Sequence, residues 1–150
     1  MLESASSSVG KALKKRALII NESTSFPGTL RDVIRPLVEK NSPLDHMYAI
    51  SPERVDPGNK SYGTKNTPRI VGGLSDEARD KAVEFYRTFC DNVVPVSSAE
   101  VAEAAKLLEN TFRFINIGLV NEFAQIMSAM NIPVDEVLKA AGTKPYGFMP

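Results

Sequence analysis

The sequence of 150 residues contains a single cysteine, no long apolar run and no run of like charges. Cys90 alone excludes a disulfide framework, and no His or Cys residues are paired at metal-ligand spacing, so no metal site is predicted. A lone cysteine fits a reducing compartment. Because neither a membrane span nor the apolar core of a signal peptide is present, we expect a soluble, cytoplasmic protein.

Charge of one sign does not dominate either, since eighteen basic residues balance eighteen acidic ones. This balance argues against nucleic acid or an anionic membrane as a partner. The hydrophobic share of 43% is enough for one domain with a core, or for pieces of two domains.

Short apolar runs alternate with helical patterns along residues 17–97, which is typical of an α/β sheet. The predicted strands are "RALIIN", "MYAIS", "RIVGG" and "NVVPVSS". Helices are predicted over residues 3–14, 30–40 and 75–89. Pro36 predicts a kink or an early end of the second helix, and Ser75 is the predicted N-cap of the third.

The pattern of residues 98–130 predicts one long helix in which the distribution of apolar side chains changes midway. Its first half is amphipathic, whereas residues 111–127 carry apolar side chains on nearly every side. Such a helix is buried, either in a core or against another subunit. A short helix is predicted from Pro133 to Ala141, with Gly142 as the residue that follows its end. Both ends of the chain look cut, so we expect a fragment of a longer protein.

The loop "SPERVDPGNK" at residues 51–60 is the first candidate site. Pro52, Pro57 and Gly58 shape its backbone, and a rigid loop at a strand end can present Glu53 to a ligand. A solvated turn is the alternative. Thr24 also follows a strand end, where open α/β sheets bind ligands, although a helix cap is the commoner use of such a threonine.

Lys106 and Asn110 are four residues apart on the long helix, and Glu103 and Arg113 extend the same stripe. A cation beside an amide can stabilise negative charge on an oxygen, whereas an exposed stripe with ordinary contacts is the alternative. His46 is expected to be exposed, and Cys90 to be structural.

Five segments in this order resemble the nucleotide-sugar dehydrogenases of the UDP-glucose/GDP-mannose type, and within them the UDP-N-acetylglucosamine or UDP-N-acetylmannosamine 6-dehydrogenases. They are "ESTSFPGT", "SPERVDPGN", "RIVGG", "VVPVSSAEVAEAAKLLENTFRFINIGLVNE" and "TKPYGFMP". The resemblance implies an oxidoreductase that converts the C6 alcohol of a UDP-sugar to a carboxylate with two NAD+, through a covalent cysteine intermediate.

The same resemblance implies the domain organisation. Residues 1–97 correspond to the C-terminal half of a Rossmann-like NAD-binding domain. Residues 98–150 correspond to the start of an all-α central domain, whose long helix forms a homodimer.

Site residues follow from the resemblance position by position. Thr24 corresponds to the threonine near the nicotinamide and the catalytic water, with Ser23 beside it in the cofactor site. Glu53 corresponds to the acid–base glutamate, and Arg54 and Val55 to its neighbours at the substrate. Lys106 and Asn110 correspond to the pair that holds the sugar oxygen and the oxyanion. On the same helix, Arg113 is assigned to the substrate.

Two family motifs are missing from this sequence: the G-x-G-x-x-G turn that binds pyrophosphate and the G-G-H-C segment with the catalytic cysteine. We therefore expect the chain alone to be inactive. Arg54, Val55 and Pro57 depart from the S-P-E-F-L pattern of the UDP-glucose branch and favour an N-acetylhexosamine substrate. The alternative function is a non-catalytic oligomerisation module.

Overall fold

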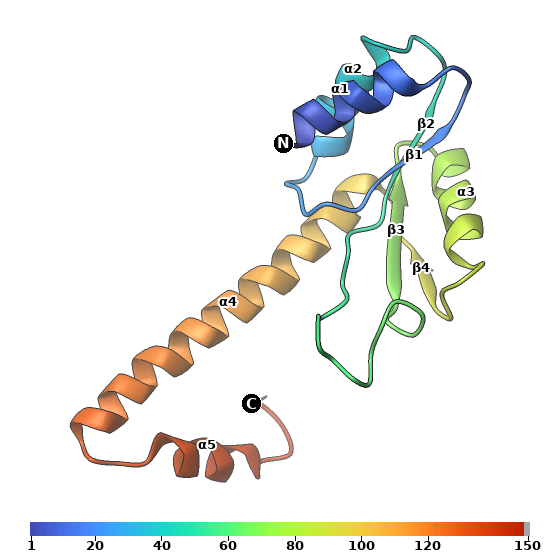
Figure 1. Ribbon diagram of the computed structural model, residues 1–150. Helices are drawn as coiled ribbons and strands as arrows, with labels where there is room; N and C mark the ends of the chain where they lie inside the picture. The colour runs from blue at the N-terminus through green and yellow to red at the C-terminus, as the bar shows by residue number, and fades with distance from the viewer. Residues whose placement is uncertain (149–150) are drawn as a thin grey trace. The chain divides into compact units, whose positions relative to one another are not determined.

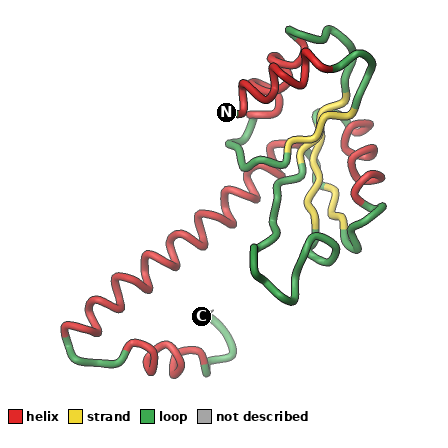
Figure 2. Tube along the Cα trace, viewed as in Figure 1, coloured by secondary structure: helices red, strands yellow, loops and turns green. Residues whose placement is uncertain are grey.

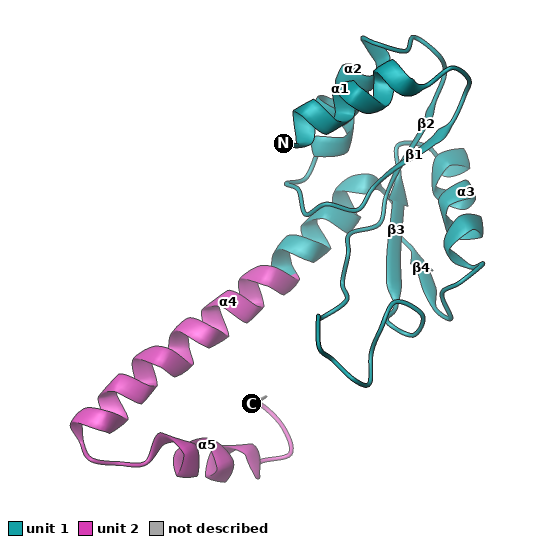
Figure 3. Cartoon of the chain, viewed as in Figure 1, with its two compact units in different colours: residues 1–108 teal, residues 109–150 magenta. Residues whose placement is uncertain are grey.

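The computed structural model describes residues 1–148 (Figure 1) and divides the chain into two compact units. Unit 1 runs from Met1 to Leu108, and unit 2 begins at Glu109 (Figure 3). All four strands of the described chain belong to unit 1.

Unit 1 is built on a four-stranded sheet in the order β1-β2-β3-β4. The strands are β1 (Leu18–Asn21), β2 (Met47–Ile50), β3 (Arg69–Gly73) and β4 (Val93–Pro95). β1 pairs with β2 in parallel, as β3 does with β4, whereas β2 and β3 are antiparallel. Residues 51–68 form a loop without a helix (Figure 2), so β3 lacks the crossover that a parallel neighbour of β2 would need.

Helices cover both faces of this sheet because its strands are apolar on both sides. Tyr48 and Ile50 pack with η1 (Leu30–Ile34), α2 (Arg35–Glu39) and the first turn of α4 (Ala99–Ala129). The helix α1 (Leu2–Ala12) packs on α2. Ala49 points the other way, into a core shared with α3 (Asp76–Tyr86). Figure 1 shows α1 and α2 on one side of the strands and α3 on the other. The sheet is therefore the middle layer of three.

Pro36 shapes the helix that follows β1. The helix opens as a π-helical turn, η1 (Leu30–Ile34), and continues as the α-helix α2, in whose first turn Pro36 lies. A proline ring clashes with the carbonyl four residues before it, and the wider π turn is a way to accommodate that clash. Where the sequence predicted a kink or an early end of the helix, the structure shows a change of helix type just before Pro36.

The two glycines of "RIVGG" allow two helices to begin directly against β3. A Cβ on Gly72 would lie 2.4 Å from the Ser98 carbonyl oxygen, at the start of α4. A Cβ on Gly73 would lie 2.6 Å from the Arg79 backbone nitrogen in α3. Neither distance is compatible with a side chain, so glycine is required at both positions.

Unit 2 contains the remainder of α4 and the helix α5 (Val134–Gly142). Helix α4 is followed by Asn131 in a left-handed conformation, with φ of 55°. The Ile132 N–H donates to the Met127 carbonyl at 2.9 Å, a bond typical of a helix C-terminus. Gly142 does not follow α5 as predicted: it is the last helical residue, and Thr143 is the C-cap. The left-handed backbone falls instead at Gly147, with φ of 75°.

The four predicted strands and the long helix are confirmed, and two further local predictions, besides that for Gly142, are wrong. The helix α3 ends at Tyr86 rather than near Phe89, although Ser75 does cap it by accepting the Ala78 N–H at 3.2 Å. His46 is buried instead of exposed. Its Nδ1 accepts the Ala17 N–H at 3.1 Å and its Nε2 lies 2.9 Å from the Ser42 hydroxyl, so the imidazole is satisfied inside the fold.

Within residues 1–148, none of the helices combines the length and the apolar character that crossing a bilayer requires.

Candidate active site

The loop after β1 is shaped by the side chain of Asn21, the last residue of the strand. Its amide donates to the Ser23 carbonyl and accepts the Ser23 N–H, both at 3.1 Å. Ser23 and Thr24 are exposed beyond the carboxyl end of β1, and Ser23 lines an open groove of about 690 Å³ along that strand. No described residue forms a hydrogen bond with the Thr24 hydroxyl, so the helix-cap interpretation of Thr24 does not hold.

The loop after β2 brings Glu53 to the same end of the sheet. The Glu53 N–H donates to the Glu22 carbonyl at 3.0 Å, which joins this loop to the β1 loop. Its carboxylate is held in place by the chain itself: Oε1 accepts the N–H groups of Arg54 at 2.7 Å and Val55 at 2.8 Å. The Glu53 carboxylate is therefore oriented, although about half of its side chain, 45%, is exposed.

Electrostatics keep the Glu53 side chain ionised. Partial burial alone would raise its pKa, but the hydrogen bonds from Val55 and Arg54 and the positive charge of Arg69 outweigh burial and lower it. A carboxylate of this kind can accept a proton or orient a donor at neutral pH. It is not available as a proton donor there.

Glu103 connects the β1 loop to α4. Its side chain is fully buried and accepts three hydrogen bonds: from the Gly28 N–H at 2.6 Å, the Leu30 N–H at 3.0 Å and the Ser25 hydroxyl at 3.2 Å. The Gly28 and Leu30 amides stand at the start of η1, where helix N–H groups have no partner within the helix. Glu103 therefore fastens the first turns of α4 to the segment that carries Thr24.

Lys106 lies three residues after Glu103, close to one turn further along α4. It is half-buried, and among the described residues its ammonium forms no hydrogen bond or ion pair. A lysine in this position is a cation without a carboxylate partner, which suits it to stabilise negative charge on a bound molecule.

The predicted site residues thus divide between the two units. Thr24, Glu53 and Lys106 belong to unit 1, where the contacts of Glu22 and Glu103 connect their segments. Arg54 and Val55 follow Glu53 in its loop, and the Arg54 guanidinium donates to the Pro68 carbonyl at 2.9 Å. Asn110 and Arg113 are exposed on α4 within unit 2, and their place in a shared site stays a prediction.

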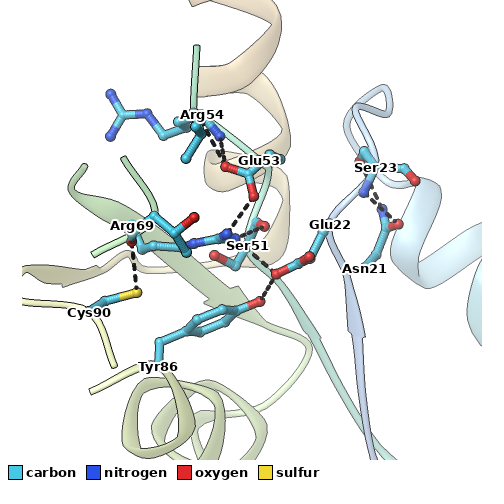
Figure 4. A network of polar contacts seen from close by, with 11 residues as sticks. Asn21, Glu22, Ser23, Ser51, Glu53, Arg54, Arg69, Tyr86 and Cys90 are labelled. Carbon is cyan, nitrogen blue, oxygen red and sulfur yellow. Dashed lines mark hydrogen bonds and ion pairs between the residues drawn. The ribbon is translucent and has the colours of Figure 1, made fainter. Parts of the chain in front are cut away.

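Sequence reasoning missed two polar residues that organise this site. Arg69, at the start of β3, is only 5% exposed and pairs with Glu22 and Glu53 (Figure 4). The sequence feature that could have revealed Arg69 is its position as a charged residue at the start of an apolar, buried strand. A buried charge requires partners. Glu103 was assigned to a polar stripe, although its small neighbour Ala102, which is fully buried, marks a closely packed part of the helix.

Cys90 takes no part in the site. It is buried in the core shared with α3, and its thiol donates to the Thr64 carbonyl at 3.5 Å. The prediction that this cysteine is structural agrees with that environment.

A sheet flanked by helices, with polar loops beyond the carboxyl ends of β1 and β2, defines the class of open α/β nucleotide-binding folds. Residues 1–90 match the NAD binding domain, and residues 100–150 the central domain, of the UDP-glucose/GDP-mannose dehydrogenase family. The chain belongs to the UDP-glucose/GDP-mannose dehydrogenase family.

Several characterised relatives match almost the whole chain. A UDP-N-acetyl-D-glucosamine 6-dehydrogenase from Pseudomonas aeruginosa is 42% identical over 154 residues, which cover 99% of this chain and 36% of that protein. The structure of a UDP-D-ManNAc dehydrogenase from Pyrococcus horikoshii superposes with a TM-score of 0.88 at 36% identity, covering 99% of this chain and 36% of that one. The UDP-N-acetyl-mannosamine dehydrogenase Cap5O from Staphylococcus aureus gives 0.82 at 34% identity, covering 98% and 36%.

The chain therefore spans about a third of the length of the relatives that it matches. The Rossmann-type NAD-binding fold and NAD as its cofactor follow from the family. The predicted resemblance is confirmed at the level of the family.

Proposed function

We propose that this chain supplies part of the active site of an NAD-dependent UDP-N-acetylhexosamine 6-dehydrogenase. The relatives at 34–42% identity carry the names of UDP-N-acetylglucosamine and UDP-N-acetylmannosamine dehydrogenases, which supports this substrate class. The observation that carries the proposal is the attachment of both the Glu53 loop and α4 to the β1 segment, through the Glu53 N–H and the Glu103 carboxylate.

In the proposed reaction NAD, when bound, would supply the hydride acceptor for oxidation at C6 of the sugar. Ser23 and Thr24 would contact the nicotinamide side of the cofactor, and the Thr24 hydroxyl would hold a water near the reacting carbon. The ionised Glu53 would accept a proton from the C6 hydroxyl or from that water, since its carboxylate is oriented by two backbone amides.

Residues of α4 would meet the negative charge that develops on the substrate oxygen. The Lys106 ammonium and the Asn110 amide would both donate to that oxygen. Arg113 and the backbone of Arg54 and Val55 would bind the rest of the substrate. With no catalytic cysteine motif and no pyrophosphate-binding glycine motif in this sequence, the chain alone is proposed to be inactive.

The central claim about substrate can be tested by grafting. The aligned segment of the Pseudomonas relative is replaced by this chain, and NADH formation is followed with UDP-N-acetylglucosamine and with UDP-glucose. We expect the folded graft to oxidise the N-acetylhexosamine substrate in preference, and the chain alone to form no NADH. A folded graft with no activity, or with a preference for UDP-glucose, would contradict the proposal.

A second candidate function is oligomerisation, because α4 exposes large apolar side chains beyond residue 111. Phe114 is 77% exposed, Leu119 62% and Ile126 53%. Exposed apolar patches of this kind mark interaction surfaces. We propose that this helix pairs with a second copy of the chain. The two candidate functions differ in what they require of Glu53 and Lys106. The enzyme needs both residues in its active site, whereas an oligomerisation module without catalysis needs neither.

A further inference from the structure

Arg69 is a buried cation at the start of β3. Its side chain is 6% exposed, although arginine is rarely buried without partners. Burying a guanidinium costs free energy unless its donors and its charge are both satisfied. The residues around Arg69 supply both hydrogen-bond acceptors and negative charge.

Two carboxylates from different loops share the Arg69 guanidinium (Figure 4). Its Nη2 lies 2.5 Å from Glu53 Oε2, and its Nη1 lies 2.9 Å from Glu22 Oε1 and 3.4 Å from the Ser51 carbonyl. Glu22 follows β1 and Glu53 follows β2, so one side chain connects the loops at the ends of both strands. The planar fork of arginine can reach two carboxylates at once, which the single ammonium of lysine does less well.

Tyr86, from α3, fixes the guanidinium from a third direction. The Arg69 Cζ lies 4.9 Å from the centre of the Tyr86 ring, within the range of a cation–π contact. The Tyr86 hydroxyl donates to Glu22 Oε1 at 2.5 Å, and burial followed by this hydrogen bond raises the pKa of that phenol. Tyr86 therefore stays protonated and holds Glu22 on the side of Arg69.

We propose that Arg69 is the positioning residue of the site: it holds the Glu53 carboxylate in place and ties it, through Glu22, to the loop that carries Thr24. This inference rests on the proposed function of Glu53. Arg69 touches neither substrate nor cofactor in this account. Its effect on the reaction passes through the two carboxylates that it holds, Glu53 and Glu22.

The groups around Glu53 determine in which direction its pKa should move when a neighbouring charge is removed. The backbone N–H groups of Val55 and Arg54 and the charge of Arg69 lower the pKa of Glu53, and Tyr86 is neutral. Glu22 pairs with the same guanidinium, and a second negative charge close to a carboxylate disfavours its ionisation. Removing the Arg69 charge should therefore raise the pKa of Glu53. Removing the Glu22 charge should lower it further.

The test follows the Glu53 carboxyl carbon by NMR during an acid titration of the full 150-residue chain. In Arg69→Met we expect its pKa to rise by about one pH unit or more, as is usual for a carboxylate that loses an adjacent arginine. The matched control is Arg79→Met, because Arg79 pairs with Asp76 and Asp80 on α3, apart from this network. It should leave the titration of Glu53 unchanged.

Glu22→Gln provides a second, milder variant in case Arg69→Met fails to fold. It retains Arg69 and should move the Glu53 titration to lower pH. A folded Arg69→Met chain with an unchanged Glu53 pKa would overturn the proposal, as would an unchanged or raised pKa in Glu22→Gln.

The grafted enzyme separates this proposal from the proposed function. If both are right, Arg69→Met moves the acid limb of the kcat/KM profile upward by the same amount as the NMR pKa. If the NMR shift appears but the acid limb does not move, Arg69 still positions Glu53, and the catalytic role of Glu53 fails.

Discussion

Single charged residues decide how the loops of this site are held, and Glu103 is the clearest example. Its two oxygens accept the Gly28 and Leu30 amides separately, so an isosteric amide would point one NH2 group at an N–H donor. We expect Glu103→Gln to lower the free energy of unfolding by about 1–3 kcal/mol, the usual cost of an unsatisfied buried donor. Urea denaturation measures this change.

The control for that substitution is Glu84→Gln on α3. Glu84 is exposed, and its one ion pair within residues 1–148 is with Lys81, so its replacement should leave the unfolding free energy unchanged within error. Equal effects of the two substitutions would mean that the Glu103 contacts do not support the β1 segment.

Residues of this kind also mark the limit of the sequence prediction. The resemblance predicted roles for Glu53 and Lys106, because they belong to local motifs that can be read along the chain. Arg69 and Glu103 satisfy their polar groups with partners 16 to 78 positions away, and His46 accepts the Ala17 N–H from 29 positions away in addition to its contact with Ser42. No local pattern shows such partners, so the sequence did not show that these residues are buried and paired.

At the scale of elements, strand β3 depends on glycine where α4 begins. An alanine Cβ at position 72 would overlap the Ser98 carbonyl, which belongs to backbone and cannot move aside cheaply. We expect Gly72→Ala to cost about 1–3 kcal/mol of unfolding free energy, as overpacking usually does. Gly63→Ala is the control, since nothing lies within 4 Å of its Cβ position, and it should change stability by less than about 0.5 kcal/mol.

Strands and helices were largely predictable because their signals are periodic or lie within a few residues. The apolar runs predicted all four strands, and the pattern after Ser98 predicted α4. The antiparallel pairing of β2 with β3 was not predicted, because it follows from the course of residues 51–68 in space. The position of Gly142 inside α5 was also missed, since glycine at a helix end is a preference and not a requirement.

At the scale of the whole molecule, the account predicts self-association through residues 111–130. Each large apolar side chain left in water forgoes roughly 1.5–3 kcal/mol of burial, and a two-fold pairing presents the same patch from both copies. We expect light scattering to show a dimer or a larger aggregate at micromolar concentration. Replacing Phe112 and Leu119 with glutamate should yield monomers.

Lys106→Ala serves as the control for association, because Lys106 precedes the apolar segment. It should leave the measured mass unchanged. A clean monomer of the unsubstituted chain would contradict the proposed pairing, and it would also weaken the oligomerisation module as an alternative function.

The most direct test of the central claim is the initial rate of NADH formation by the graft described above, with single substitutions in the segment. We predict that Glu53→Gln and Lys106→Ala each lower kcat by about 10²–10⁴-fold, the usual range for a lost acid–base or oxyanion group. Lys139→Ala, an exposed lysine on α5, should retain the rate of the unsubstituted graft. Rates for Glu53→Gln and Lys106→Ala that equal that of Lys139→Ala, in folded grafts, would contradict the claim that these residues form the active site.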